Sequence, residues 1–286
     1  MSKNKLISLE IIMLLLVAFI TFNVAKSTDT IRILLVSADG GYNQYYGTSL
    51  KEFKSALDKG GYFYDIWIES VKGRITDSSV LKPYDIVIWT CGDYASMAIP
   101  TEQECVIMDY VNKGGNILIE GEMVAFSIVK YTEGALLDFL SVYFMYYSLD
   151  VSGIIPNPDL PHLINEGLGT VNWATTPTRG PNGVYPKGNA YPVMYYIGTN
   201  FSAVTVVEGN ETGKGSVVYY SFALFNLPEG ARNILVSNSI RWFIQQSQQK
   251  GMFEFSSIQI ACAIIIIVGL ILAVLAIARK RKMYHA

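Results

Sequence analysis

Three acidic residues each come directly after an apolar run that is typical of a buried β-strand: Asp39, Asp93 and Glu122. The carboxyl ends of neighbouring parallel strands meet at one edge of a sheet, where ligands of such sheets gather. We therefore expect these carboxylates to share a rim with Tyr42 and Tyr94. Carboxylate oxygens suit Ca²⁺ or Mg²⁺, and aromatic rings suit sugars or peptides. The sequence thus predicts a ligand-binding rim, with the three acidic residues as candidate ligands of Ca²⁺.

A plainer interpretation gives the same residues structural roles. Asp39 would shape the turn at Gly40 and Gly41, Asp93 would cap the following helix, and Glu122 would lie in solvent. Acidic residues favour both turns and helix starts, so their positions alone do not distinguish the two interpretations. Both stay open at this stage.

Cysteine and histidine chemistry is poorly supported. Cys91 ends an apolar run and Cys105 falls on a predicted helix, with a disulfide bridge between them left open. The two histidines are His162, in a proline-rich stretch, and His285, near the C-terminus. A cysteine nucleophile needs an adjacent base, and a zinc site needs several His or Cys ligands. The sequence therefore favours a protein that is not an enzyme, without excluding one.

Strands and helices alternate through the first half of the chain. Such alternation predicts right-handed crossovers and a parallel sheet. We therefore predict an α/β fold, a flavodoxin-like three-layer sandwich with a mainly parallel sheet. The predicted strands cover residues 31–37, 64–68, 85–91 and 116–120, and the predicted helices cover residues 50–57 and 101–111.

The pattern changes in the second half of the chain. Residues 133–149 are rich in aromatics and are predicted to be helical, which would pair Tyr143 with Tyr147 on one face. That spacing favours packing into the core, and an exposed binding surface is the alternative. Residues 150–200 hold most of the prolines and are predicted as an insertion of loops and short strands. A hairpin over residues 202–222 and a helix over residues 233–246 complete the prediction.

Both ends of the chain are apolar. Residues 1–27 have the form of a signal peptide, with an uncleaved N-terminal anchor as the alternative. Residues 257–278 are long and apolar enough for a transmembrane helix, and the basic residues 279–286 are predicted to be cytoplasmic. The domain over residues 28–256 is therefore predicted to lie outside a cell membrane that the chain crosses once. Small residues in the span would also allow lateral association.

Partner classes follow from charge and short motifs. The chain has a net charge of −2, but residues 27–256 hold 15 Lys and Arg against 23 Asp and Glu, so the middle is acidic. An acidic domain does not bind a phosphate backbone, and the glycine-rich motifs of nucleotide binding are absent, so we expect neither nucleic acid nor nucleotide as a ligand. Asn200 and Asn210 stand in sequons and are candidate glycosylation sites.

Several segments resemble the class I glutamine amidotransferase-like superfamily, in particular its non-catalytic extracellular branch. The similar segments are residues 33–36, 64–67, 84–89, 114–121 and 213–222. An active member carries a cysteine at a strand-to-helix elbow, which corresponds here to residues 121–125. Glu122 and Met123 at that elbow cannot act as a thiolate. The resemblance implies the fold of this superfamily without its catalytic Cys-His-Glu set.

Together these observations predict a cell-surface binding or scaffolding module with a catalytically degenerate ectodomain. Its expected partners are the membrane and an envelope protein or a glycan, in the manner of an accessory to an envelope transport or secretion system. The alternative function is an extracellular hydrolase of glycans or peptides that acts through Asp39, Asp93 and Glu122.

Overall fold

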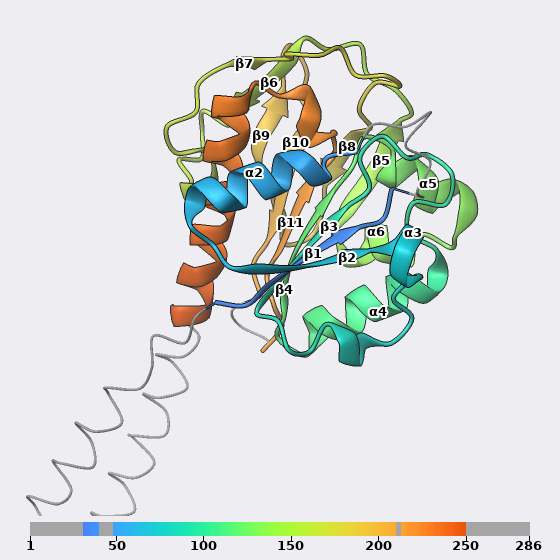
Figure 1. Cartoon of the computed structure of the whole chain (residues 1–286). Helices are drawn as coiled ribbons and strands as arrows, with labels where there is room; N and C mark the ends of the chain where they lie inside the picture. Colours follow the sequence, from blue (N-terminus) through green and yellow to red (C-terminus); the bar gives the residue numbers. More distant parts are fainter. Residues whose placement is uncertain (1–30, 40–47, 210–212, 250–286) are drawn as a thin grey trace, which may run out of the picture. The chain divides into compact units, whose positions relative to one another are not determined.

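An eleven-stranded mixed sheet forms the centre of the protein (Figure 1). The computed structural model describes residues 31–39, 48–209 and 213–249. The strand order is β2-β1-β3-β4-β11-β10-β9-β6-β7, with β8 pairing with both β10 and β5. The first five strands of this order are parallel to one another, and the remaining pairs are antiparallel.

The parallel strands lie where the sequence predicts them. Their bounds are β1 Ile33–Ser37, β2 Tyr64–Ile68, β3 Ile86–Thr90 and β4 Asn116–Glu120. All residues of β1, β3 and β4 are buried, because helices cover both faces of this part of the sheet. Successive side chains of a strand point to opposite faces, so these strands need apolar residues at nearly every position.

Helices cover the two faces (Figure 1). On one face lie α2 and the helix over residues 229–249, whose Ser239 Oγ is 2.7 Å from the Tyr220 hydroxyl of the sheet. On the other face, α4, α5 and α6 enclose a core cluster that includes Leu34, Trp89 and Ile119. The bounds are α2 Leu50–Gly60, α3 Glu69–Lys72, α4 Thr101–Asn112, α5 Val124–Tyr131 and α6 Ala135–Phe139.

The second half of the chain extends the sheet with antiparallel strands. The predicted mainly parallel sheet is corrected to a mixed one, because this extension contributes more strands than the sequence suggests. The predicted insertion supplies β6, β7, β8 and β9, and the predicted hairpin forms as β10 and β11. The bounds are β6 Gly153–Pro156, β7 Val171–Asn172, β8 Gly183–Pro186, β9 Ala190–Tyr196, β10 Ser202–Val207 and β11 Val217–Tyr220; three 3₁₀ turns cover Ser78–Val80, Leu163–Asn165 and Leu224–Asn226.

The predicted helix over residues 133–149 is only partly correct. Its first part forms α6, but Val142–Tyr146 is strand β5, paired with β8. Ser141 between them has a φ of 53°, a conformation that is uncommon outside glycine and breaks the helix there. The aromatic residues that follow fit a strand, where their rings have lateral space, better than a helix.

The predicted fold class is also corrected with respect to the membrane. Residues 257–278, predicted as a transmembrane helix, lie outside the described residues, as do 1–27 and 279–286. Within the ranges that the structure covers, no helix is both long and apolar enough to cross a bilayer. The fold described is therefore a mixed α/β sandwich without a membrane-spanning helix.

Candidate functional site

The carboxyl ends of β1, β3 and β4 lie side by side, as predicted for the rim. Asp39, Asp93 and Glu122 nevertheless do not form a metal-binding group. In the part of the chain that the structure describes, no group of three or more His, Cys, Asp and Glu side chains could hold a metal ion. The geometry thus gives the predicted metal set no support, and Ca²⁺ as a cofactor stays a prediction.

Glu122 is fully buried, which corrects the interpretation that places it in solvent. Its carboxylate accepts hydrogen bonds from the backbone N–H of Arg179 at 2.6 Å and from Nδ2 of Asn226 at 3.3 Å. Burial raises the pKa of Glu122, and the neighbouring charge of Asp93 raises it further. Glu122 therefore ties the predicted insertion to the sheet.

The other predicted rim residues have separate surroundings. Asp39 is 7% exposed and accepts a hydrogen bond from Ser37 Oγ at 3.2 Å. Asp93 is buried in the loop before α4, whose N-cap is Pro100, so Asp93 does not cap that helix as the plainer interpretation expects. Tyr94 is half-buried, and Tyr42 lies outside the described residues.

Glu120 is a second buried carboxylate at this edge, and sequence reasoning missed it. It accepts hydrogen bonds from Ser49 Oγ at 2.6 Å, Thr90 Oγ1 at 2.5 Å and the Leu224 N–H at 2.5 Å. Burial raises its pKa to about 7, against the lowering effect of these donors. A carboxyl with that pKa is suited to proton transfer, but Glu120 has no exposed surface and both oxygens are engaged. Its role is therefore structural.

The elbow between β4 and α5 is where the amidotransferase-like resemblance places a nucleophile. Met123 occupies it, is fully buried, and has an unstrained φ of −120°. Asn182 from the insertion fills the space above it: Oδ1 accepts from the Phe126 N–H at 2.8 Å, and Nδ2 donates to the Tyr147 carbonyl at 2.7 Å. The insertion therefore packs directly against the elbow.

A small hollow of about 220 Å³ lies beside the same edge, against residues that follow β1, β2 and β3. Glu69, Arg74 and Tyr94 contribute its polar groups. Burial raises the pKa of Glu69 to about 7, although a hydrogen bond from Gln103 and the charge of Arg74 act in the opposite direction. Met97, at the mouth, has a φ of 57°, which is strained for this side chain. The hollow could admit a small polar molecule beside a carboxyl that is half-protonated near neutral pH.

Cysteine and histidine side chains contribute no catalytic set among the described residues. Cys91 and Cys105 are both free thiols, so no bridge joins them. Burial raises the pKa of the Cys91 thiol well above its usual value. His162 accepts the Ile164 N–H on Nδ1 at 3.1 Å and thereby caps a 3₁₀ turn. Burial lowers the pKa of His162, so the ring is neutral near pH 7.

A second candidate site is an exposed apolar surface on β5 and the residue that follows it, which we call the β5 surface and define by Tyr143, Met145, Tyr146 and Tyr147. These side chains are 56%, 58%, 58% and 47% exposed, so the prediction that Tyr143 and Tyr147 pack into the core is wrong. The alternative of an exposed surface fits instead.

The two sequon asparagines have different positions. Asn200 is exposed in the turn between β9 and β10, and Asn210 lies outside the described residues.

Comparison with known proteins gives matches at the level of structure. No protein-family model matches the chain, and no curated protein sequence does. A ThuA-like protein from Bacteroides uniformis is 13% identical, with a TM-score of 0.50 over 77% of this chain and 94% of its own. Two Salmonella typhimurium proteins also match over 74% of this chain: STM3548 (16% identity, TM-score 0.50, 98% of its own length) and STM1381 (17%, 0.51, 99%).

These neighbours support the fold alone. ThuA-like proteins have the class I glutamine amidotransferase-like fold, so the resemblance is confirmed at the level of fold alone. Both Salmonella proteins are described as cytoplasmic. Because the described residues also include no membrane-spanning helix, the predicted single-pass placement in a cell membrane is not retained. At these identities the chain is similar in fold to an amidotransferase-like protein of the ThuA kind.

Proposed function

We propose that this chain is a non-catalytic binding module that holds a segment of a partner protein on the β5 surface. The observation that carries the proposal is the exposure of four large side chains within five residues: Tyr143, Met145 and Tyr146 on β5, and Tyr147 directly after it. Contiguous exposed apolar side chains mark interaction sites in soluble folds, and Tyr and Met are enriched at protein interfaces.

The β5 surface is held rigid from behind. The Tyr147 ring packs edge-on against Phe126 of α5, with ring centroids 4.5 Å apart. Tyr146 packs against Phe201 at 5.7 Å, and the Lys187 ammonium lies 4.4 Å from the Tyr143 ring centroid. Rings that are already ordered lose little side-chain entropy on binding, which favours affinity.

The strand itself favours a polypeptide as the ligand. Among the described strands β5 pairs with β8 alone. A strand with one neighbour can add an extended segment through its backbone, and the adjacent side chains then supply specificity. A peptide uses both the backbone and the rings, whereas a glycan would use only the rings.

The occupied elbow supports the non-catalytic part of the proposal. Met123 stands where the resemblance implies a nucleophile, and Asn182 closes the space above it. Glu122 is locked by the Arg179 backbone, so a hydrolase that acts through Asp39, Asp93 and Glu122 gains no support from the geometry.

The test is a selection of peptides from a displayed library on the full-length chain, followed by affinity measurement with single peptides. The double variant Tyr143→Ser, Tyr146→Ser should weaken the selected peptides by roughly 30-fold or more, since aromatic anchors contribute about 2 kcal/mol or more at interfaces. Phe63→Ser is the matched control, because Phe63 is 78% exposed in the connection between α2 and β2. Selected peptides that bind the wild type and the double variant equally would contradict the proposal. Binding of glycans to the β5 surface instead of peptides would also contradict it.

A further inference from the structure

One lysine beside the β5 surface carries a charge that no acidic residue balances within the part of the chain that the structure describes. Lys130 is exposed on α5, the helix that packs beside β5 (Figure 1). Its ammonium makes no ion pair with any described residue. Acidic residues outnumber basic ones over residues 27–256, so this isolated cation is a local exception in an acidic domain.

Aromatic rings that belong to the same surface hold this ammonium in place. Lys130 Nζ lies 5.3 Å from the centroid of the Phe126 ring and 5.0 Å from that of Tyr131. An ammonium within about 6 Å of a ring centroid is attracted to the face of the ring. The Phe126 ring in turn packs edge-on against Tyr147, with centroids 4.5 Å apart. The charge therefore has an ordered position next to the Tyr147 end of the β5 surface.

The helix that carries Lys130 does not neutralise it. Lys130 lies in the last turn of α5, where a cation is favoured by the helix dipole. The dipole supplies only about half an elementary charge, and aromatic rings carry no net charge. The ammonium has three N–H donors, so it can still receive a carboxylate from another molecule.

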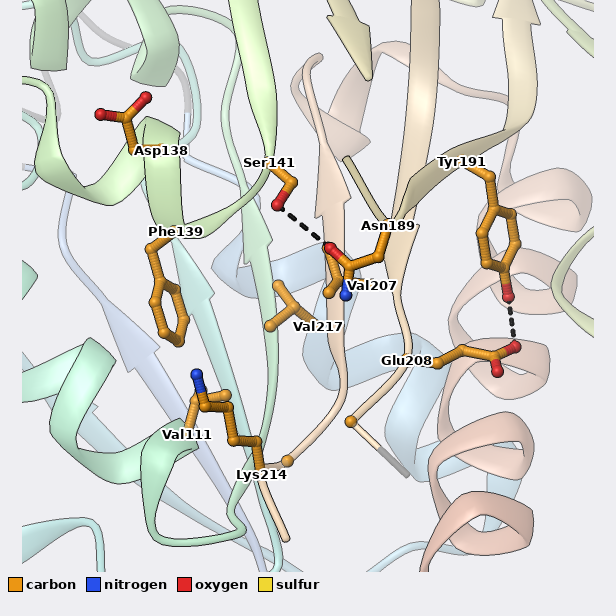
Figure 2. Close-up of a pocket in the computed structure, with 12 residues that line it drawn as sticks. Val111, Asp138, Phe139, Ser141, Asn189, Tyr191, Val207, Glu208, Lys214 and Val217 are labelled. Atoms are coloured by element: carbon orange, nitrogen blue, oxygen red, sulfur yellow. Dashed lines mark hydrogen bonds between the residues drawn. The ribbon is translucent and has the colours of Figure 1, made fainter. Parts of the chain in front are cut away.

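The opposite end of the β5 surface is electrically balanced. The ammonium of Lys187 lies 4.4 Å from the Tyr143 ring centroid, and it is paired with the carboxylate of Asp138. Asp138 also borders a hollow of about 590 Å³ at this end (Figure 2). Because Lys187 and Asp138 cancel, the surface is neutral beside Tyr143 and positive beside Tyr147.

We propose that the partner segment on the β5 surface places an Asp or Glu side chain on Lys130. This inference rests on the proposed function and adds the chemistry of the partner: apolar residues that meet Tyr143 and Tyr146, with one carboxylate beyond them at the Tyr147 end. Complementary charges at an interface fix the register of the partner and exclude wrong ones. Since the rest of the domain is acidic, we expect the carboxylate at one flank of the segment and not throughout it.

The test begins with random displayed peptides selected on the full-length chain, each fused at its C-terminus so that no terminal carboxylate takes part. The selected sequences should hold Asp or Glu at one flank of their apolar residues. Each selected peptide is then synthesised with both ends blocked, beside a copy in which this acid is replaced by Asn or Gln. The replacement should weaken binding to the wild-type protein by roughly fivefold, as loss of an exposed ion pair does.

Three variants assign the contact. Lys130→Gln should bind the acidic peptide and its amide copy equally, and Lys130→Arg, which keeps the charge, should restore the difference. Lys54→Gln is the matched control and should keep the wild-type difference, because Lys54 is exposed on α2 at the other face of the sheet. A difference between the two peptides that persists in Lys130→Gln would overturn the inference. Selected peptides without a flanking acid would overturn it as well.

The double variant Tyr143→Ser, Tyr146→Ser separates failure of this inference from failure of the proposed function. Peptides that lose affinity for the double variant but bind Lys130→Gln as they bind the wild type would leave the β5 surface as a peptide site without an acidic partner. Absence of any peptide that binds the wild-type β5 surface would overturn both.

Discussion

The carboxylate of Glu120 accepts a hydrogen bond from the backbone N–H of Leu224 at 2.5 Å, across 104 residues of sequence. The same side chain also receives donors from Ser49 at the start of α2 and from Thr90 at the end of β3. One buried acid therefore joins four segments at the carboxyl edge of the sheet. Buried polar groups with all partners in place make a fold specific, and they become costly when one partner is removed.

The first prediction concerns pH. Burial raises the pKa of Glu120 from 4.5 in the unfolded chain to about 7 in the folded one. The folded state therefore binds the proton more tightly, so its stabilising effect is full below about pH 4.5 and is lost as the pH rises to about 7. Glu120→Gln should remove this dependence. Relative to the variant, the wild type should lose about 3 kcal/mol of unfolding free energy between pH 4.5 and pH 7.5.

Urea unfolding of both proteins across this range measures the difference. Glu133→Gln is a control at an exposed carboxyl. Other carboxyls with a raised pKa, such as Glu69, change the stability of both proteins alike. Only the difference in stability between wild type and variant therefore reports on Glu120. A difference that stays constant with pH would contradict the prediction.

The parallel half of the fold could be predicted because its residues are buried on both faces. The apolar runs at β1, β3 and β4 leave little room for another interpretation, and the strand order follows from short crossovers. The segment after α6 was mispredicted, because Tyr143 and Tyr147 satisfy the helical spacing as well as they satisfy a strand with a bulge. The backbone conformation of Ser141, which decides between the two, has no signal in the sequence.

The second prediction concerns the lock between the sheet and the insertion. Glu122→Ala leaves the Arg179 N–H and the Asn226 amide without their acceptor in a buried position. Unsatisfied buried donors cost about 1–3 kcal/mol each, so we expect a loss of roughly 3 kcal/mol. The hydrogen-exchange rate of the Arg179 amide should rise above the rate expected from global unfolding alone. Unchanged protection at Arg179 would show that Glu122 does not hold the insertion.

The third prediction concerns the two described thiols. The thiolate is the form that reacts with iodoacetamide, and burial raises the pKa of the Cys91 thiol well above its usual value. Cys105 is exposed on α4. Peptide mapping after brief labelling should therefore find Cys105 modified and Cys91 unmodified, with Cys91 reacting only in denaturant. Equal labelling of both in the native protein would place Cys91 at an accessible site, against the packing described here.

The candidate site was harder to predict than the fold. The rim position of Asp39, Asp93 and Glu122 follows from strand order, but the side-chain directions depend on the insertion, which fills the space with Asn182 and the Arg179 backbone. The sequence position of Glu120 could have identified it, because it ends a fully apolar run. A carboxylate buried there destabilises the fold unless it has hydrogen-bond partners.

The last prediction concerns two glycines that pack backbone against backbone. A Cβ on Gly215 would lie 1.7 Å from the carbonyl oxygen of Gly115, and neither backbone can move without disturbing the start of β4 and β11. The Gly215 N–H also donates to the Val111 carbonyl at 2.7 Å, which fixes this approach. Gly215→Ala should therefore cost about 3 kcal/mol, as overpacking of a rigid interior does.

For a domain of this size that cost lowers the melting temperature by roughly 6–12 °C. Gly169→Ala is the matched control, because no atom lies within 4 Å of a Cβ built there, and its melting temperature should change little. Gly215 also lines the hollow shown in Figure 2, so displacement of this backbone should change that wall. Equal melting temperatures for the two variants would mean that β11 can shift away from Gly115.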